Sequence, residues 1–126
     1  NFTLSRNERL KSRKAISQVF SEGQSVHAYP FRALYKRMEG GPVREEAIKF
    51  AFAVPKRSFR KAVDRNKLKR KMREVFRLNK HLLAEELAPT TQLNVVLMYT
   101  SREKEAYDDM LQAAITILLR LAKKNK

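Results

Sequence analysis

The spacing of apolar residues changes several times along the chain, and each change marks a predicted element. Ile16, Val19 and Phe20 are spaced so that they lie on one side of a helix. They predict a helix over residues 12–22, which a capping serine opens and Gly23 ends.

Two segments alternate apolar and polar residues in the manner of strands. Residues 31–38 do so weakly after Pro30, and residues 47–54 do so strongly. In the second segment the large apolar side chains share one face, and alanines share the other, where a helix or a ligand can approach closely. Residues 39–46 contain a Gly-Gly-Pro turn signal, so the two strands are predicted to form an antiparallel hairpin.

Two further helices flank one predicted buried strand over residues 93–100. Residues 64–79 have an apolar stripe at helical spacing, and Pro89 closes the segment that follows. Thr100 and Glu103 have the spacing of a capping box, which predicts that the last helix opens there. The order is therefore αβ(β)βαβα, one α+β domain over residues 1–126. The predicted stripes are Leu68, Met72, Val75 and Phe76 in the first of these helices, and Tyr107, Met110, Leu111, Ala114, Ile115, Leu118 and Leu119 in the second.

The positive charge is concentrated in one part of the chain. The 126 residues carry 28 Lys and Arg against 13 Asp and Glu, a net charge of +15. Residues 56–80 alone hold twelve of these basic residues and only two acidic ones. Such a cluster is typical of a surface that binds an anionic partner, and a solvated basic face without a partner is the alternative.

Composition excludes several classes of protein. The chain has no cysteine, which excludes disulfides, thiolate zinc sites and a cysteine nucleophile. No apolar run approaches the roughly 20 residues of a membrane-spanning helix, and no signal-peptide pattern opens the chain. We therefore expect a soluble, cytoplasmic protein without a membrane partner.

The remaining polar residues do not indicate a self-contained active site. The acidic pairs at 45–46, 85–86 and 108–109 fall in predicted loops or on helix surfaces, where adjacent side chains diverge. His27 and His81 have no suitably spaced partners, and three glycines do not make a phosphate-binding loop. We expect no catalytic residue and no metal site on the protein itself.

The helix over residues 64–79 carries basic side chains opposite its apolar stripe, and such side chains bind phosphates. Asn66, beside them, can hydrogen-bond a base edge or a ribose hydroxyl. Because no helix-turn-helix or zinc-finger pattern accompanies this helix, structured RNA is favoured over DNA as the partner. The predicted basic ridge consists of Arg65, Lys69 and Arg73, and Arg70 and Arg77 widen it.

Residues 65–74, Arg-Asn-Lys-Leu-Lys-Arg-Lys-Met-Arg-Glu, resemble the signature of the bacterial ribonuclease P protein component, R-N-R-[IL]-K-R-x-x-R-E. Lys67 stands where Arg is usual. Segments 8–23 and 52–57 also resemble the family, so the resemblance covers nearly the whole chain. The loop over residues 58–63 departs from the family pattern, because it is one residue longer and lacks glycine.

The resemblance implies a fold like ribosomal protein S5 domain 2, in the order αβββαβα, with the basic helix in an unusual left-handed βαβ crossover. It implies that the partner is the catalytic RNA of ribonuclease P, which removes the 5′ leader of precursor tRNA by Mg²⁺-dependent hydrolysis. Mg²⁺ would be bound mainly by that RNA. The implied RNA-binding residues are Lys56, Arg57, Arg65, Asn66, Lys67, Lys69, Arg70, Arg73 and Arg77. The leader would lie in a cleft between the first helix and the sheet, lined by Phe20, Tyr35 and Ile16.

Alternatives stay open at this point. For Phe20 an ordinary core position is the alternative. A structural rRNA-binding or ribosome-assembly protein would carry the same charge. A protein-only ribonuclease would need convergent carboxylates, which the sequence does not provide. The helix signature favours the ribonuclease P protein.

Overall fold

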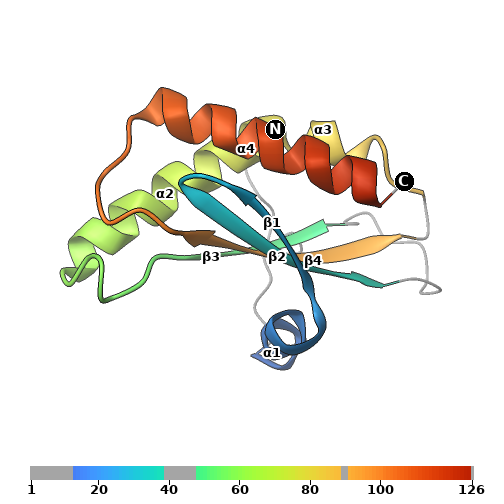
Figure 1. Ribbon diagram of the computed structural model, residues 1–126, viewed down its shortest axis with the longest axis horizontal. Coiled ribbons are helices and arrows are strands. Elements are labelled where there is room, and N and C mark those ends of the chain that lie inside the picture. The colour runs from blue at the N-terminus through green and yellow to red at the C-terminus, as the bar shows by residue number, and fades with distance from the viewer. Residues whose placement is uncertain (1–12, 39–47, 89–90, 126) are drawn as a thin grey trace.

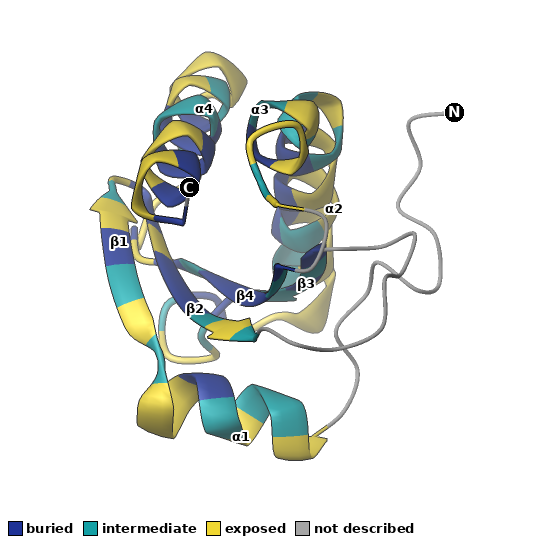
Figure 2. Cartoon of the chain, turned by 90° about the vertical axis from the view of Figure 1, so that its right-hand side faces the viewer, coloured by how far each residue is buried: buried dark blue, intermediate teal, exposed yellow. Residues whose placement is uncertain are grey.

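Within residues 13–38, 48–88 and 91–125, which the computed structural model describes, a four-stranded sheet has three helices on one face and one on the other. Helix α1 crosses one face, and α2, α3 and α4 cover the other (Figures 1 and 2). The elements are α1 (Arg13–Glu22), β1 (Gln24–Ala28), β2 (Phe31–Met38), β3 (Ile48–Ala53), α2 (Ala62–Asn79), α3 (His81–Ala84), β4 (Gln92–Tyr99) and α4 (Tyr107–Lys124).

The sheet order is β1-β2-β4-β3, so the predicted hairpin between β2 and β3 is wrong. β4 lies between these two strands, antiparallel to β2 and parallel to β3. The actual hairpin is β1 with β2, where Ala28 lies opposite Phe31. The sequence pattern did not locate β1 because Val26 is its one large apolar residue. The turn signal at 39–46, the capping Ser12 and Pro89 lie outside the described residues.

The connection from β3 to β4 passes through α2 and α3 and forms the expected βαβ crossover. In Figure 2 both strands run away from the viewer, β4 lies to the left of β3, and α2 lies above the sheet. An observer who looks across the sheet from β3 towards β4 therefore sees the chain turn anticlockwise as it moves away. The crossover is left-handed. Most such crossovers are right-handed, because strand twist and helix hand favour that path. The α+β fold in the order αβββαβα is confirmed, with α3 as an additional short helix.

The larger core lies between the sheet and the three helices. Phe31 of β2 and Phe50 of β3 are buried there, together with the predicted stripe of α2. The rings of Phe31 and Phe76 meet edge to face, with centroids 5.3 Å apart. Phe76 of α2 thus joins two strands that do not pair with each other. This packing fixes the orientation of α2 on the sheet.

A smaller core holds α1 against the other face. Val19 packs there with Leu34 of β2 and Val96 of β4, and Ala51 lies beside them. This confirms that the alanine face of β3 allows a helix to approach closely. Gly23 ends α1, as predicted, and its N–H donates to the carbonyl oxygen of Val19 at 2.9 Å. A Cβ at this position would collide with backbone oxygens of α1 and β2, so glycine is required.

Helix α4 begins later and faces the core differently than predicted. It starts at Tyr107 after Ala106, which makes no side-chain cap, so the capping box at Thr100 and Glu103 is wrong. Instead, the hydroxyl of Ser101 accepts the N–H of Glu103 at 3.0 Å and holds a loop there. Two members of the predicted stripe, Tyr107 and Leu119, are 37% and 51% exposed. The buried residues are Met110, Ala113, Ala114, Ile117, Leu118, Leu121 and Ala122.

None of the helices in the described part of the chain is both long enough and apolar enough to cross a membrane.

Candidate nucleic-acid interface

The polar side of α2 is a basic surface on a firmly packed helix. The four residues of its apolar stripe are buried, and Phe76 contacts Phe52 of β3 with ring centroids 6.1 Å apart. Because this packing fixes the rotation of the helix, its basic side chains keep a defined spacing. Asn66, Lys67, Arg70 and Arg73 are exposed, and Lys69 and Arg77 are half-buried.

Arg65 does not continue the predicted ridge with Lys69 and Arg73. Its Nη1 donates hydrogen bonds to the backbone carbonyl oxygens of Phe59 at 2.9 Å and Arg60 at 2.7 Å. The guanidinium group therefore turns back onto the loop before α2. The ridge prediction is wrong at this residue, because helical spacing places a side chain but does not show competing acceptors in a neighbouring loop.

Lys56 and Arg57 are exposed on the turn that follows β3. The N–H groups of Ser58 and Phe59 both donate to the Pro55 carbonyl oxygen, at 3.2 and 3.3 Å. The buried ring of Phe59 then meets Tyr99 edge to face, with centroids 5.8 Å apart. This loop departs from the family pattern, yet it is anchored and holds its cations beside the start of α2.

The structure adds cations to this surface that sequence reasoning missed. Arg60 and Lys61 are exposed in the loop before α2. Lys104, from the loop between β4 and α4, lies 3.3 Å from Asp64 in the first turn of α2. No sequence signal joins Lys104 to Asp64, because 40 residues separate them and only the fold brings them together.

The predicted leader cleft is only partly assembled. Phe20 is 51% exposed, and Ile16 packs against the smaller core, so both lie on the α1 face of the sheet. Tyr35 is 3% exposed and belongs to the core on the opposite face. The placement of Tyr35 in this cleft is therefore wrong. A shift of one residue along a strand reverses the face, and Leu34 is the residue of β2 that faces α1.

A row of polar side chains crosses the sheet on the α1 face, next to the apolar residues beneath α1. Lys36 of β2 lies opposite Asn94 of β4, which in turn lies opposite Lys49 of β3. The Nζ of Lys36 is 2.8 Å from a carboxylate oxygen of Glu22, at the end of α1. Sequence reasoning missed this row because it depends on the register of three strands, two of which are far apart in the chain.

The acidic side chains that the structure describes do not gather into a magnesium site. Glu22, Asp64 and Glu74 each face a cation, Glu74 through a 3.7 Å contact with Arg77 one turn along α2. Across the part of the chain that the structure describes, no three Asp, Glu or His side chains gather closely enough to hold a metal ion. His27 and His81 are both exposed, on β1 and at the start of α3. The described residues thus provide isolated carboxylates, and not a group of oxygen ligands that could surround a magnesium ion.

The fold and this surface define a small α+β domain that displays one dense cluster of cations on a helix packed across a sheet. The model of the family Ribonuclease P matches residues 4–123. The ribonuclease P protein component of Porphyromonas gingivalis is 37% identical over 122 residues, which cover 96% of this chain and 88% of that protein. The chain belongs to the ribonuclease P protein family.

Solved structures agree with this assignment. The ribonuclease P protein from Thermotoga maritima has a TM-score of 0.69 with 25% identity, over 90% of this chain and 96% of that one. The Staphylococcus aureus protein has a TM-score of 0.68 over 92% and 95%, and its 18% identity makes it evidence for the fold alone. Membership of the family implies a role in a ribonuclease complex and partnership with the ribonuclease P RNA.

Proposed function

We propose that the chain is the protein subunit of a ribonucleoprotein that removes the 5′ leader of precursor tRNA, with catalysis carried by the RNA subunit. The observation that supports this best is the basic side of α2, a helix whose opposite, apolar side packs on Phe31 and Phe52 through Phe76. Arg and Lys side chains held at fixed spacing suit a structured phosphate backbone better than a flexible basic tail does.

The RNA-binding surface in this proposal combines three segments. Exposed residues of α2 form its centre, and the turn at Lys56 and Arg57 extends it beyond the start of the helix. Lys104 borders it from the loop after β4. Arg65 contributes chiefly as a positioning residue, because its Nη1 holds the preceding loop.

The leader site in this proposal uses the α1 face of the sheet without Tyr35. Phe20 offers a half-exposed ring, and exposed Arg32 lies on the same face of β2 as Leu34. A ring beside cationic side chains is a common platform for a single-stranded nucleotide. Mg²⁺ would be held mainly by the RNA, since Glu22 and Asp64 each face a cation instead of another carboxylate.

Reconstitution tests the proposed function. The purified protein alone should not cleave precursor tRNA, and addition of a bacterial ribonuclease P RNA with Mg²⁺ should give cleavage at the mature 5′ end. The protein should lower the Mg²⁺ concentration that the RNA needs. Cleavage by RNA-free protein that a carboxylate substitution abolishes would overturn the proposal. Copurification with rRNA in place of ribonuclease P RNA would instead support a ribosomal role.

A further inference from the structure

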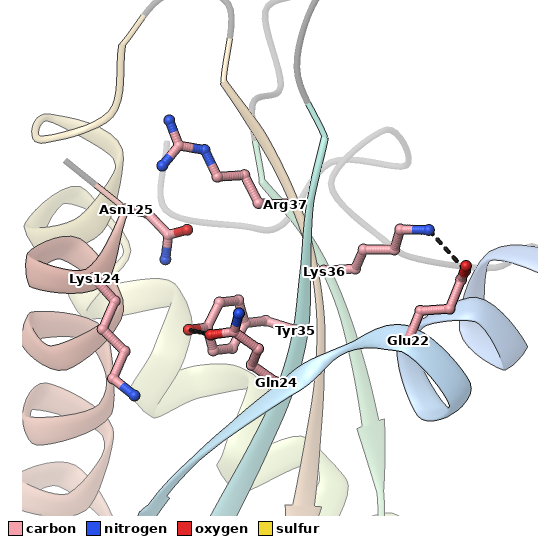
Figure 3. Close-up of a pocket in the computed structure, with 7 residues that line it drawn as sticks. All are labelled: Glu22, Gln24, Tyr35, Lys36, Arg37, Lys124 and Asn125. Atoms are coloured by element: carbon pink, nitrogen blue, oxygen red, sulfur yellow. Dashed lines mark hydrogen bonds and ion pairs between the residues drawn. The ribbon is translucent and has the colours of Figure 1, made fainter.

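A pocket of about 340 Å³ opens where the end of α1, the start of β1, the end of β2 and the last turn of α4 meet (Figure 3). Its volume lies within the range of about 300–1,000 Å³ that is typical of small-ligand pockets. In Figure 1 the last turn of α4 and the start of α2 lie at opposite ends of the molecule. The pocket is lined by Glu22, Gln24, Tyr35, Lys36, Arg37, Lys124 and Asn125.

Two of the cations that line the pocket lie on the side that faces α4. Figure 3 shows Lys36 and Glu22 on one side of β2, where they pair at 2.8 Å. Arg37 and Lys124 lie on the other side, between β2 and α4. Two cations from segments far apart in the sequence thus border one hollow, which suits an anionic group.

The lining of this pocket includes an oriented amide. The buried hydroxyl of Tyr35 donates to Gln24 Oε1 at 2.9 Å. Burial raises the pKa of Tyr35, so its hydroxyl stays protonated and keeps this bond at neutral pH. Because its oxygen is held by Tyr35, Gln24 presents its Nε2 amide as a donor at the mouth of the pocket.

The end of α4 is arranged so that it does not repel an anion strongly. The last carbonyl oxygens of a helix carry partial negative charge, which disfavours an anion nearby. Asn125 satisfies one of them twice, since its backbone N–H and its Nδ2 donate to the Leu121 oxygen at 3.1 and 2.8 Å. Lys124 in the same turn adds positive charge.

We propose that this pocket binds one nucleotide of an RNA chain, with the phosphate between Arg37 and Lys124 and with Gln24 donating to the sugar or the base. The inference rests on the proposed function, since it takes RNA to be the partner. It places a second RNA contact at the end of the molecule that is remote from the start of α2. An RNA chain that contacts both ends of the protein would be bound in a single orientation along the domain.

Adjacent lysines in α4 provide a matched test. The full chain would be titrated into a labelled single-stranded RNA decamer at several KCl concentrations, with anisotropy as the readout. Lys124→Ala should weaken binding about 3- to 10-fold and lower the salt slope by about 0.7. Lys123→Ala removes the same charge from the same turn but does not line the pocket, and it should change binding less than twofold. Equal losses in the two variants would overturn the proposal.

Nuclear magnetic resonance separates the possible ligand sources. The side-chain amide signal of Gln24 should shift when the decamer is added, and less so with AMP or inorganic phosphate at the same concentration. A response to inorganic phosphate without one to the decamer would overturn the RNA assignment. The variant with Lys69, Arg70 and Arg73 all changed to Ala separates the two hypotheses. If that variant loses RNA binding while Lys124→Ala does not, only the pocket proposal fails. If neither variant changes binding, the proposed function fails as well.

Discussion

The Nη1 of Arg65 donates a hydrogen bond to the backbone oxygen of Phe59 at 2.9 Å and so ties the first turns of α2 to the loop before it. The ring of Phe59 packs against Tyr99 at the end of β4. The hydroxyl of Tyr99 in turn donates to the Glu103 carbonyl oxygen at 2.6 Å and accepts the N–H of Glu105 at 2.9 Å. Three segments are thereby joined, and their cations keep fixed relative positions on one surface.

Arg65→Ala should destabilise the domain, because two loop carbonyl oxygens lose a charged donor. Hydrogen bonds to charged groups contribute about 1.5–3 kcal/mol, so we expect a loss of that order in the free energy of unfolding measured with urea. Arg70→Ala is the matched control, since Arg70 is exposed on the same helix, and it should change stability by less than about 0.5 kcal/mol. Equal stability of the two variants would show that the Arg65 contacts do not hold the loop.

Replacing Lys69, Arg70 and Arg73 together with Ala should weaken binding to ribonuclease P RNA and leave the fold intact. Arg65 is left in place, because its loss would confuse stability with binding. Each lost phosphate contact should flatten the plot of log affinity against log salt by roughly 0.7–0.9. Binding would be measured across a KCl series, with Lys123→Ala as control and with circular dichroism to verify folding. An unchanged salt slope in the folded triple variant would show that α2 is not the RNA site.

The helical and strand patterns predicted most of the elements because each element buries one face. Residues 31–38 and the stripe at Leu68, Met72, Val75 and Phe76 were located correctly for this reason. The hairpin prediction was wrong, because the pairing of β4 between β2 and β3 depends on contacts between distant segments. Sequence periodicity indicates which side of an element is buried, but it does not indicate which other element pairs with it.

The candidate site was predicted less completely than the fold, for a related reason. Charge density located the basic helix, but Lys104 joins it only through the fold. The family resemblance placed Tyr35 in the leader cleft, but Tyr35 lies on the opposite face of the sheet, and its neighbour Leu34 faces α1. Arg65 has the right residue type for phosphate binding and is engaged by its own loop. Residue type limits the possible roles, and the local contacts select among them.

Tyr99 should make stability sensitive to alkaline pH. Burial raises the pKa of its phenol, and the N–H of Glu105 opposes this only in part. A folded pKa above the unfolded value of about 10 means that the stabilisation is complete below pH 10 and is lost as the pH rises through the folded pKa. Urea unfolding from pH 8 to 11 should therefore show a decline that is smaller in Tyr99→Phe. That variant should also be less stable at pH 8, because it lacks the bond to Glu103. If the free energy of unfolding declined equally with pH in both proteins, the loss of stability at alkaline pH would be due to other groups.

Phe20→Ala should weaken the binding of precursor tRNA to the reconstituted holoenzyme and leave mature tRNA unaffected, because mature tRNA lacks the leader. One aromatic platform contributes about 1–3 kcal/mol per stacked base in comparable single-strand sites. Leu119→Ala is a matched control, since Leu119 is also 51% exposed and lies on α4, away from the α1 face. Tyr35→Ala, by contrast, should lower stability and show no preference between the two RNAs, since Tyr35 is buried in the opposite core. The dissociation constants for both RNAs would be measured for all three variants in Ca²⁺, so that cleavage is slow during the titration. If Phe20→Ala lowered the affinity for precursor and mature tRNA equally, the ring of Phe20 would have a structural role. If Tyr35→Ala selectively lowered the affinity for precursor tRNA, the leader would bind on the face of the sheet opposite α1.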